Sequence, residues 1–173
     1  MRKPALLVLS LFLSVAAFAQ HDAATPQKPL SPKQQVEYKA GKKKKITIDY
    51  SAPSKRERVI FGGLVPYGQV WRTGANAATT LTTNADLMIG SLHVPAGTYT
   101  LYTIPGEKEW TLIVNKQTGQ WGTEYDQKQD LGRVKLYVAS PLKTPVETFR
   151  IGIDKTLSFT WDTTKVWVPI VVH

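Results

Sequence analysis

The sequence predicts an all-β fold: a single antiparallel β-sandwich, jelly-roll-like or barrel-like, with about 8–10 short strands and at most one short helix. Three observations predict this class. Apolar and polar residues alternate with period two in many short runs, which is the pattern of half-buried strands. Turn residues recur every ~8–12 residues between these runs. No segment after the N-terminal leader keeps a 3.6-residue apolar repeat over the ~10–12 residues that a helix needs.

The N-terminus has the pattern of a secretory signal peptide. Met1-Arg2-Lys3 supplies a charged head, residues 5–18 are apolar apart from two serines, and Ala17-Phe18-Ala19 is a small-x-small cleavage site. The apolar run is shorter than the ~20 residues of a membrane-spanning helix, which disfavours an uncleaved anchor. We therefore expect residues 1–19 to be removed and the soluble protein to be exported, to the periplasm or the exterior, with no transmembrane segment.

Residues 20–33 are expected to form a flexible linker. Pro26, Pro29 and Pro32 stand there among alanine, glutamine, serine and lysine, with too little apolar content to fold. Residues 34–173 are long enough to bury one core, and we expect them to form one β-sandwich domain.

The first half of the expected domain consists of strand patterns divided by turns. In one of them Ile46, Ile48 and Tyr50 share a face at period two. Gly90 separates two apolar runs and predicts a hairpin or bulge, and Pro105-Gly106 ends a later run. The segments expected as strands are 35–38, 45–50, 79–83, 87–89, 91–94, 98–104 and 110–115.

Alternation continues to the C-terminus. Leu157, Phe159 and Trp161 alternate with hydroxyl-bearing residues, and similar patterns lie in residues 134–138, 149–153 and 166–172. Residues 123–131 are the one segment that fits a short helix, and they fit a loop equally well.

Composition excludes several kinds of chemistry. The chain has no cysteine, which removes disulfides, thiolate catalysis and thiolate metal sites. Its formal charge of +9 becomes +7 without Arg2 and Lys3, because 20 basic residues then face 13 acidic ones. Such a charge favours anionic envelope polymers or acidic glycans as partners over nucleic acid. The run Lys42–Lys45 is typical of a solvated turn or a protected edge strand.

A group of motifs in the middle of the chain resembles a known family. They include Val70-Trp71-Arg72-Thr73-Gly74-Ala75-Asn76, and with it Gly62 to Gly68, Pro95 to Tyr99, Ile104-Pro105-Gly106 and Trp110 to Asn115. The chain resembles, from about Tyr38 to the C-terminus, the exported bacterial family catalogued as domain of unknown function 2911. The resemblance implies a secreted or periplasmic β-rich domain with no established activity. The family often has an acidic residue just after the asparagine, and Ala77 at that position disfavours catalysis by this loop.

Trp71, Arg72 and Asn76 are the first candidate site. An indole offers a flat face to a sugar or aromatic ring, a guanidinium is a donor fork for carboxylate or phosphate, and an amide both donates and accepts. In the alternative, structural interpretation, Trp71 anchors the core, Arg72 pairs with a carboxylate beneath the loop, and Asn76 bonds its own turn.

A second cluster surrounds Trp121. Glu124 and Asp126, together with Asp130, supply carboxylates that would form a glycosidase-like acid/base pair if their spacing in space allowed it. Carboxylates on a loop are more often solvated, and a calcium-binding loop of the EF-hand type is absent.

Metal, nucleotide and nucleophile chemistry find little support in the sequence. His93 is the one histidine embedded in the expected domain, so neither a typical zinc site nor a catalytic triad is indicated, and no cofactor is expected. Three hypotheses stay open. The first is a non-catalytic binding module that holds a polar or anionic ligand, such as an envelope glycan, between Trp71, Arg72, Asn76 and Trp121. The others are a small hydrolase of envelope polymers that uses Glu124 or Asp126, and a purely structural envelope protein.

Overall fold

The computed structural model describes residues 30–173, which form eleven strands and one 3₁₀ turn, η1 (Gln127–Gln129). The predicted all-β class is confirmed, with eleven strands in this range where about 8–10 were expected. The expected signal peptide (residues 1–19) and residues 20–29 of the expected linker lie outside the described residues. The strands are β1 (Lys33–Ala40), β2 (Lys44–Ser51), β3 (Thr79–Thr83), β4 (Leu87–Ile89), β5 (Leu92–Val94), β6 (Gly97–Ile104), β7 (Trp110–Asn115), β8 (Asp130–Val138), β9 (Val146–Ile153), β10 (Thr156–Asp162) and β11 (Thr164–Val172).

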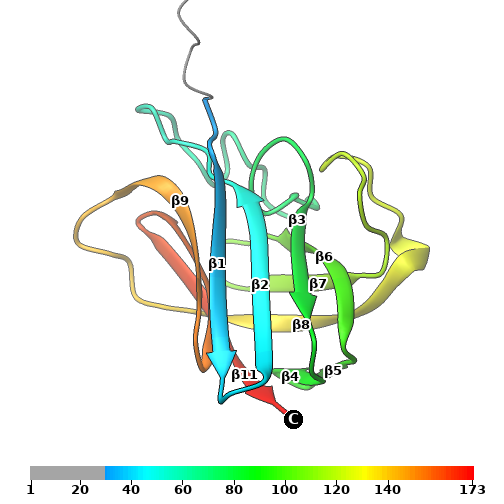
Figure 1. The fold of residues 1–173 in the computed structure, drawn as a ribbon. Helices are drawn as coiled ribbons and strands as arrows, with labels where there is room; N and C mark the ends of the chain where they lie inside the picture. The colour runs from blue at the N-terminus through cyan, green and yellow to red at the C-terminus, as the bar shows by residue number, and fades with distance from the viewer. Residues whose placement is uncertain (1–29) are drawn as a thin grey trace, which may run out of the picture.

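The strands pair antiparallel in one sheet that curls almost into a barrel (Figure 1). Its order is β1-β2-β3-β6-β7-β8-β11-β10-β9, and β4 pairs with both β11 and β5. The two ends of this order approach each other where β9 meets the chain that leaves β2. There the Phe149 N–H donates to the Pro53 carbonyl at 2.9 Å, and the Lys55 N–H donates to the Glu147 carbonyl at 2.7 Å. These bonds bring residues 53–55 into the site region as part of the sheet framework.

Period-two patterning places the core inside the curl. In β10, Leu157, Phe159 and Trp161 are buried, whereas the hydroxyl-bearing residues between them are only half-buried. Near the end of the sheet that carries residues 52–78, the core becomes aromatic. The cluster consists of Phe61, Trp71, Trp110, Phe149 and Trp161, and its ring centroids lie 4.7 to 6.2 Å apart in the contacting pairs. This cluster is the support on which the site loops rest.

The segment that fitted a short helix is a single 3₁₀ turn. It begins after Asp126, whose carboxylate accepts the Lys128 N–H at 2.9 Å, and it ends at Gln129, just before β8 begins at Asp130. The helix is limited to one turn because the residues that follow, from Asp130 on, pair in strand β8. Within residues 30–173, no helix is long and apolar enough to cross a membrane.

Two long loops lie at the same end of the sheet. In Figure 1, residues 52–78 and the loop between β7 and β8 both lie in the upper half, whereas β4, β5 and the C-terminus lie at the bottom. Segments that are about 50 residues apart in sequence are thereby brought together (Ala77 bridges Trp121).

Candidate functional site

Trp71 occupies a position in the sheet. β3 begins with Thr79, which lies opposite Leu101 of β6, and Trp71 is bridged to Thr103, two residues further along β6. The Trp71 N–H donates to the Thr103 carbonyl at 2.7 Å, and the Thr103 N–H donates back at 2.9 Å. Residues 72–78 are therefore an excursion that leaves the sheet and returns to it, and Arg72 is the first residue of that excursion.

Local hydrogen bonds hold the excursion in an unusual backbone conformation. Thr73 is fully buried with φ at +53°, and Asn76 has φ at +60°. A left-handed residue with a side chain costs roughly 1–2 kcal/mol, and a β-branched one is a genuine outlier. The Thr73 hydroxyl donates to Thr103 Oγ1 at 3.1 Å, and its carbonyl accepts the Thr79 hydroxyl at 2.8 Å. These bonds to neighbouring residues thus hold the loop in one defined conformation.

The Trp71 indole belongs mostly to the core. It stacks on Trp161 with ring centroids 5.9 Å apart and planes 16° apart, and Phe149 packs against it edge-on at 5.1 Å. This matches the structural interpretation of Trp71. The residue stays half-buried, so part of the indole still lines a cleft.

Arg72 departs from that structural interpretation. Among residues 30–173, no carboxylate lies within 4.0 Å of its guanidinium, and its one hydrogen bond is a long one of 3.5 Å to the Asn76 carbonyl. Its aliphatic stem packs on Gly122, whose N–H donates to the same Asn76 carbonyl at 3.0 Å. Packing of the stem on Gly122 thus positions the Arg72 guanidinium, and most of its N–H donors have no hydrogen-bond partner within residues 30–173.

Three arginines surround one cleft of about 350 Å³, which we call the arginine cleft. Arg56, Arg58 and Arg72 line it, Trp71 and Trp161 contribute aromatic lining, and no acidic residue is among its lining residues. Within the described part of the chain, neither the Arg56 nor the Arg58 guanidinium has a carboxylate within 4.0 Å, although the Arg56 backbone N–H donates to the Glu147 carboxylate at 2.9 Å. The other lining residues are Leu30, Ser31, Pro53, Ser54, Leu64, Val65, Gly74, Ala75 and Asn76.

Backbone carbonyls fix the two outer arginines. Arg58 donates from Nε to the Lys55 carbonyl at 2.9 Å and from Nη2 to the Ser54 carbonyl at 2.7 Å. Arg56 donates to the Leu30 carbonyl at 3.2 Å. A guanidinium has five N–H donors, so each of these groups keeps free donors beside the cleft. Lys55 ties the segment down through an ion pair of 2.9 Å with Asp162.

A second cleft of about 440 Å³, which we call the tyrosine cleft, adjoins the arginine cleft at Arg72. Trp71 and Arg72 line both clefts, and the remaining lining residues are Gln69, Val70, Tyr102, Gly122, Thr123 and Tyr125. Burial raises the pKa of Tyr102 and of Tyr125 above 10.0, so both rings stay uncharged at neutral pH. The tyrosine cleft carries one charged group in its lining, Arg72.

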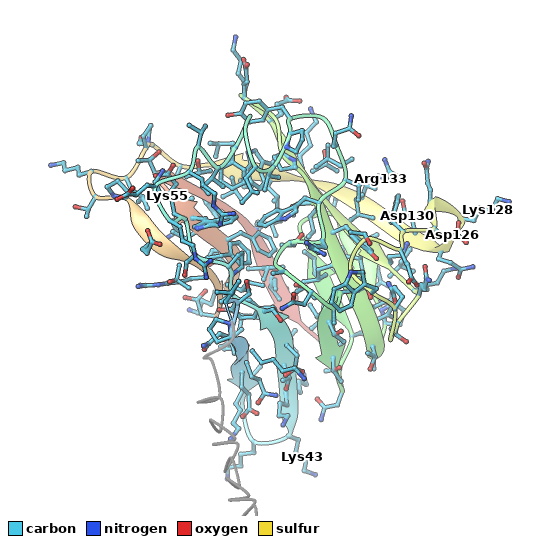
Figure 2. The ribbon with its side chains drawn as sticks, turned by 90° about the horizontal axis from the view of Figure 1, so that it is seen from above. Lys43, Lys55, Asp126, Lys128, Asp130 and Arg133 are labelled. Carbon is cyan, nitrogen blue, oxygen red and sulfur yellow. The ribbon has the colours of Figure 1, made fainter. Side chains whose placement is uncertain are left out.

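The second predicted cluster is divided: Gly122, Thr123 and Tyr125 line the tyrosine cleft, whereas Trp121 and the carboxylates line neither cleft. Trp121 is 51% exposed and bridges Ala77 through its backbone. Glu124 is exposed, and Asp126 caps η1. Asp130 is held by Arg133 Nε at 2.9 Å and by the Tyr125 hydroxyl at 2.8 Å. Figure 2 shows Asp126 and Asp130 on the opposite side of the molecule from Lys55.

The predicted ligand residues are therefore divided. Trp71, Arg72 and Asn76 line the arginine cleft together, and Trp121 lines neither cleft. The carboxylates of Glu124 and Asp126 line neither cleft. None of the carboxylates considered as an acid or base therefore lines a cleft together with the Trp-Arg-Asn motif.

Sequence comparison now assigns the chain to a family. The profile described as "Protein of unknown function (DUF2911)" matches residues 31–170. The chain belongs to this family. Searches of curated proteins and of solved structures found no match for this DUF2911 protein. Apart from Leu30, every residue that lines the two clefts lies inside the matched range.

The histidine and acidic residues of this DUF2911 protein form no metal centre in the range 30–173, where no group of three His, Cys, Asp or Glu is placed to hold an ion. His93 lies on β5 with its side chain 57% exposed, and its Nε2 is 3.3 Å from Asp86 Oδ2. β5 and its partner β4 lie at the lower end of the sheet in Figure 1, and neither His93 nor Asp86 lines a cleft.

Sequence reasoning missed Arg56 and Arg58. They stand in Lys55-Arg56-Glu57-Arg58, a short charged run that precedes the glycine-rich loop. The signal that could have indicated them is the run itself, since it contains three basic residues and one acidic residue and so carries a net positive charge. Its relation to Arg72 depends on how residues 53–55 pair with β9, which no local pattern reveals.

Proposed function

We propose that this β-rich protein is a non-catalytic binding module and that the arginine cleft holds an anionic group of its ligand. One observation carries the proposal: Arg56, Arg58 and Arg72 meet around one cleft with no acidic residue in its lining. Unpaired cations placed together repel one another, so such an arrangement is best explained by an anion that they bind together.

The chemistry of the cleft fits a carboxylate, sulfate or phosphate group. Guanidinium groups donate in a planar fork that matches these anions, and hydrogen bonds to charged groups contribute about 1.5–3 kcal/mol each. Arg58 is already fixed by two carbonyls, so little of its conformational freedom is lost on binding. The aromatic lining, mainly from the half-buried Trp71, makes one side of the cleft apolar, which strengthens the attraction between the arginines and an anion.

The proposed site revises the four residues that the sequence suggested. Trp71, Arg72 and Asn76 stay in it, Arg56 and Arg58 join it, and Trp121 does not line it. The hydrolase hypothesis lacks comparable support because no carboxylate lines either cleft.

We further propose that the protein meets its ligand outside the cytoplasm. The proposal keeps the expected order of a signal peptide (residues 1–19), a linker (20–33) and a binding domain (34–173), and it adds Leu30 and Ser31, at the end of the expected linker, to the site because they line the arginine cleft. It is supported by the charged, apolar and small-x-small pattern of the leader and by the basic composition. An acidic envelope glycan is the ligand class that fits both the location and the charge.

Calorimetric titration with glucuronate at low salt tests the proposal. We expect Arg58→Gln and Arg72→Gln each to weaken glucuronate binding by about tenfold or more, because each removes a charge-assisted contact. Arg150→Gln is the matched control, since Arg150 is an exposed strand residue outside both clefts and its loss changes the net charge equally.

Thermal unfolding of each variant checks that the fold is kept. If wild-type protein binds none of glucuronate, sulfate and phosphate, the proposal fails and the structural alternative stands. If Arg150→Gln weakens binding as much as Arg58→Gln does, net charge and not the cleft is responsible, and the proposal fails as well.

A further inference from the structure

The two clefts adjoin each other. Trp71 and Arg72 line both, so a ligand that extends past these residues from the arginine cleft can reach the tyrosine cleft. Arg72 therefore serves as the shared wall, and it can contact units of a ligand on both sides.

Gly122 keeps this wall in place. A Cβ atom at Gly122 would lie 2.5 Å from Arg72 Cδ and 2.7 Å from the Asn76 carbonyl oxygen, both far inside contact distance. The absence of a side chain lets the β7–β8 loop approach the 72–78 excursion, and the Gly122 N–H donates to Asn76 at 3.0 Å. The β7–β8 loop and the 72–78 excursion are thus joined directly, by the Gly122–Asn76 hydrogen bond and by the packing of Gly122 on Arg72.

The size of the clefts indicates how much ligand they hold. Ligand sites usually occupy ~300–1,000 Å³. The arginine cleft, at about 350 Å³, is near the lower limit and suits one small unit. The tyrosine cleft adds a comparable space of about 440 Å³ beside Arg72. A single small anion leaves this second space unused.

The two clefts differ in chemistry. The arginine cleft has three cations in its lining, whereas the tyrosine cleft offers the Gln69 amide, the Thr123 hydroxyl and the ring of Tyr125. The Tyr125 hydroxyl is already engaged with Asp130 and Arg133, which fixes the ring. A fixed aromatic surface beside an amide and a hydroxyl suits a neutral ring that carries hydroxyl groups.

We infer that the ligand is an acidic oligosaccharide of at least two units, which crosses Arg72 with an acidic sugar in the arginine cleft and a neutral sugar in the tyrosine cleft. This inference rests on the proposed function, because it takes the arginine cleft as the anion site. It adds a second subsite and the order of the two kinds of unit.

The test compares glucuronate, N-acetylglucosamine and the hyaluronan disaccharide that joins them, each titrated into the wild-type protein. We expect the disaccharide to bind at least about tenfold more tightly than glucuronate, because the second contact becomes intramolecular. N-acetylglucosamine alone is expected to bind more weakly than glucuronate.

A variant that fills only the tyrosine cleft separates the two subsites. Thr123 is exposed, so Thr123→Trp places a bulky neutral side chain in the tyrosine cleft and leaves every arginine intact. We expect it to abolish the gain of the disaccharide over glucuronate and to keep glucuronate affinity. Thr118→Trp, at an exposed position outside both clefts, is the control and should keep the gain.

The outcomes distinguish the two proposals. Equal affinity for glucuronate and disaccharide overturns the second subsite while the anion site stands, as does loss of the gain in Thr118→Trp. Absence of glucuronate and disaccharide binding in the wild type overturns both.

Discussion

At the scale of single residues, Gly122 and Arg72 show that an arginine can be packed into a loop and still have a guanidinium that is free to bind a ligand. Arg72 is packed on Gly122 along its stem, yet within residues 30–173 its charged end has no carboxylate partner. Packing therefore orients the guanidinium without neutralising it. This combination lets an arginine bind a ligand with little loss of side-chain entropy.

Gly122→Ala is predicted to impair the site through Arg72. The added methyl group has no room against the Asn76 backbone oxygen, so the two loops must separate. We expect a loss of stability of about 1–3 kcal/mol, as for other overpacked positions, and weaker glucuronate binding. Denaturant unfolding and titration measure the two effects.

Gly119→Ala is a comparison with a different physical cause. A Cβ at Gly119 has open space, but its φ of +83° makes the substitution strained. We expect Gly119→Ala to lower stability without changing glucuronate affinity. Unchanged affinity in Gly122→Ala would contradict the positioning role of that glycine.

At the scale of elements, the β7–β8 loop is held against the outer face of β6. The Tyr102 hydroxyl donates to the Glu124 carbonyl at 2.8 Å and accepts from Gln120 Nε2 at 3.0 Å, and the Thr100 hydroxyl donates to the Gln117 carbonyl at 2.7 Å. This explains why polar residues of β6 that face away from the core are buried as fully as the core residues. The loop that lines the tyrosine cleft is thereby part of the rigid structure.

Tyr102→Phe is predicted to destabilise this loop and the protein. Its hydroxyl is buried, and its removal leaves the Glu124 carbonyl and the Gln120 amide short of a partner, at a cost of about 1–3 kcal/mol. Tyr137→Phe is the matched control, since Tyr137 is 59% exposed and should change stability by less than about 0.5 kcal/mol. Equal effects of the two substitutions on urea unfolding would refute the anchoring role of Tyr102.

At the scale of the whole molecule, the sheet curls so that its two edge strands, β1 and β9, come close to each other near the site. Residues 53–55 connect with β9 and carry the chain into the segment of Arg56 and Arg58. Stability of the whole sheet and the geometry of the arginine cleft are therefore linked. Conditions that loosen the sheet should loosen the cleft.

Low pH is one such condition, and the protonation of Asp154 contributes to the loss of stability there. The Thr156 N–H and hydroxyl donate to its carboxylate at 2.7 and 2.9 Å and hold the pKa of Asp154 below 3.8. A lowered folded-state pKa stabilises the protein above the unfolded value, and this contribution disappears as the pH falls through the folded value. We expect Asp154→Asn to unfold at a lower temperature than wild type at pH 7, with the difference shrinking as the pH falls below about 4. A difference that grows on acidification would contradict this assignment.

Much of the fold followed from local patterns. Alternation at Ile46, Ile48 and Tyr50, or at Leu157, Phe159 and Trp161, predicts strands because period two requires one face to be buried. The 3₁₀ turn was harder to predict than the strands, since such a short element is decided by what it packs against. At the site, the motif of Trp71, Arg72 and Asn76 was visible in the sequence, and its partners were not.

The sequence by itself determined the all-β class, the strand positions, the family resemblance and the motif at the centre of the excursion, because these depend on residues close together in the chain. Only the tertiary structure decided that Trp71 packs in the core and that Arg56 and Arg58 stand beside Arg72. It also placed Trp121, Glu124 and Asp126 outside both clefts. The physical reason is sheet closure: pairing between residues 53–55 and β9, and between Ala77 and Trp121, sets which charges meet. Such pairings join distant segments through backbone hydrogen bonds, which carry no signature in local sequence.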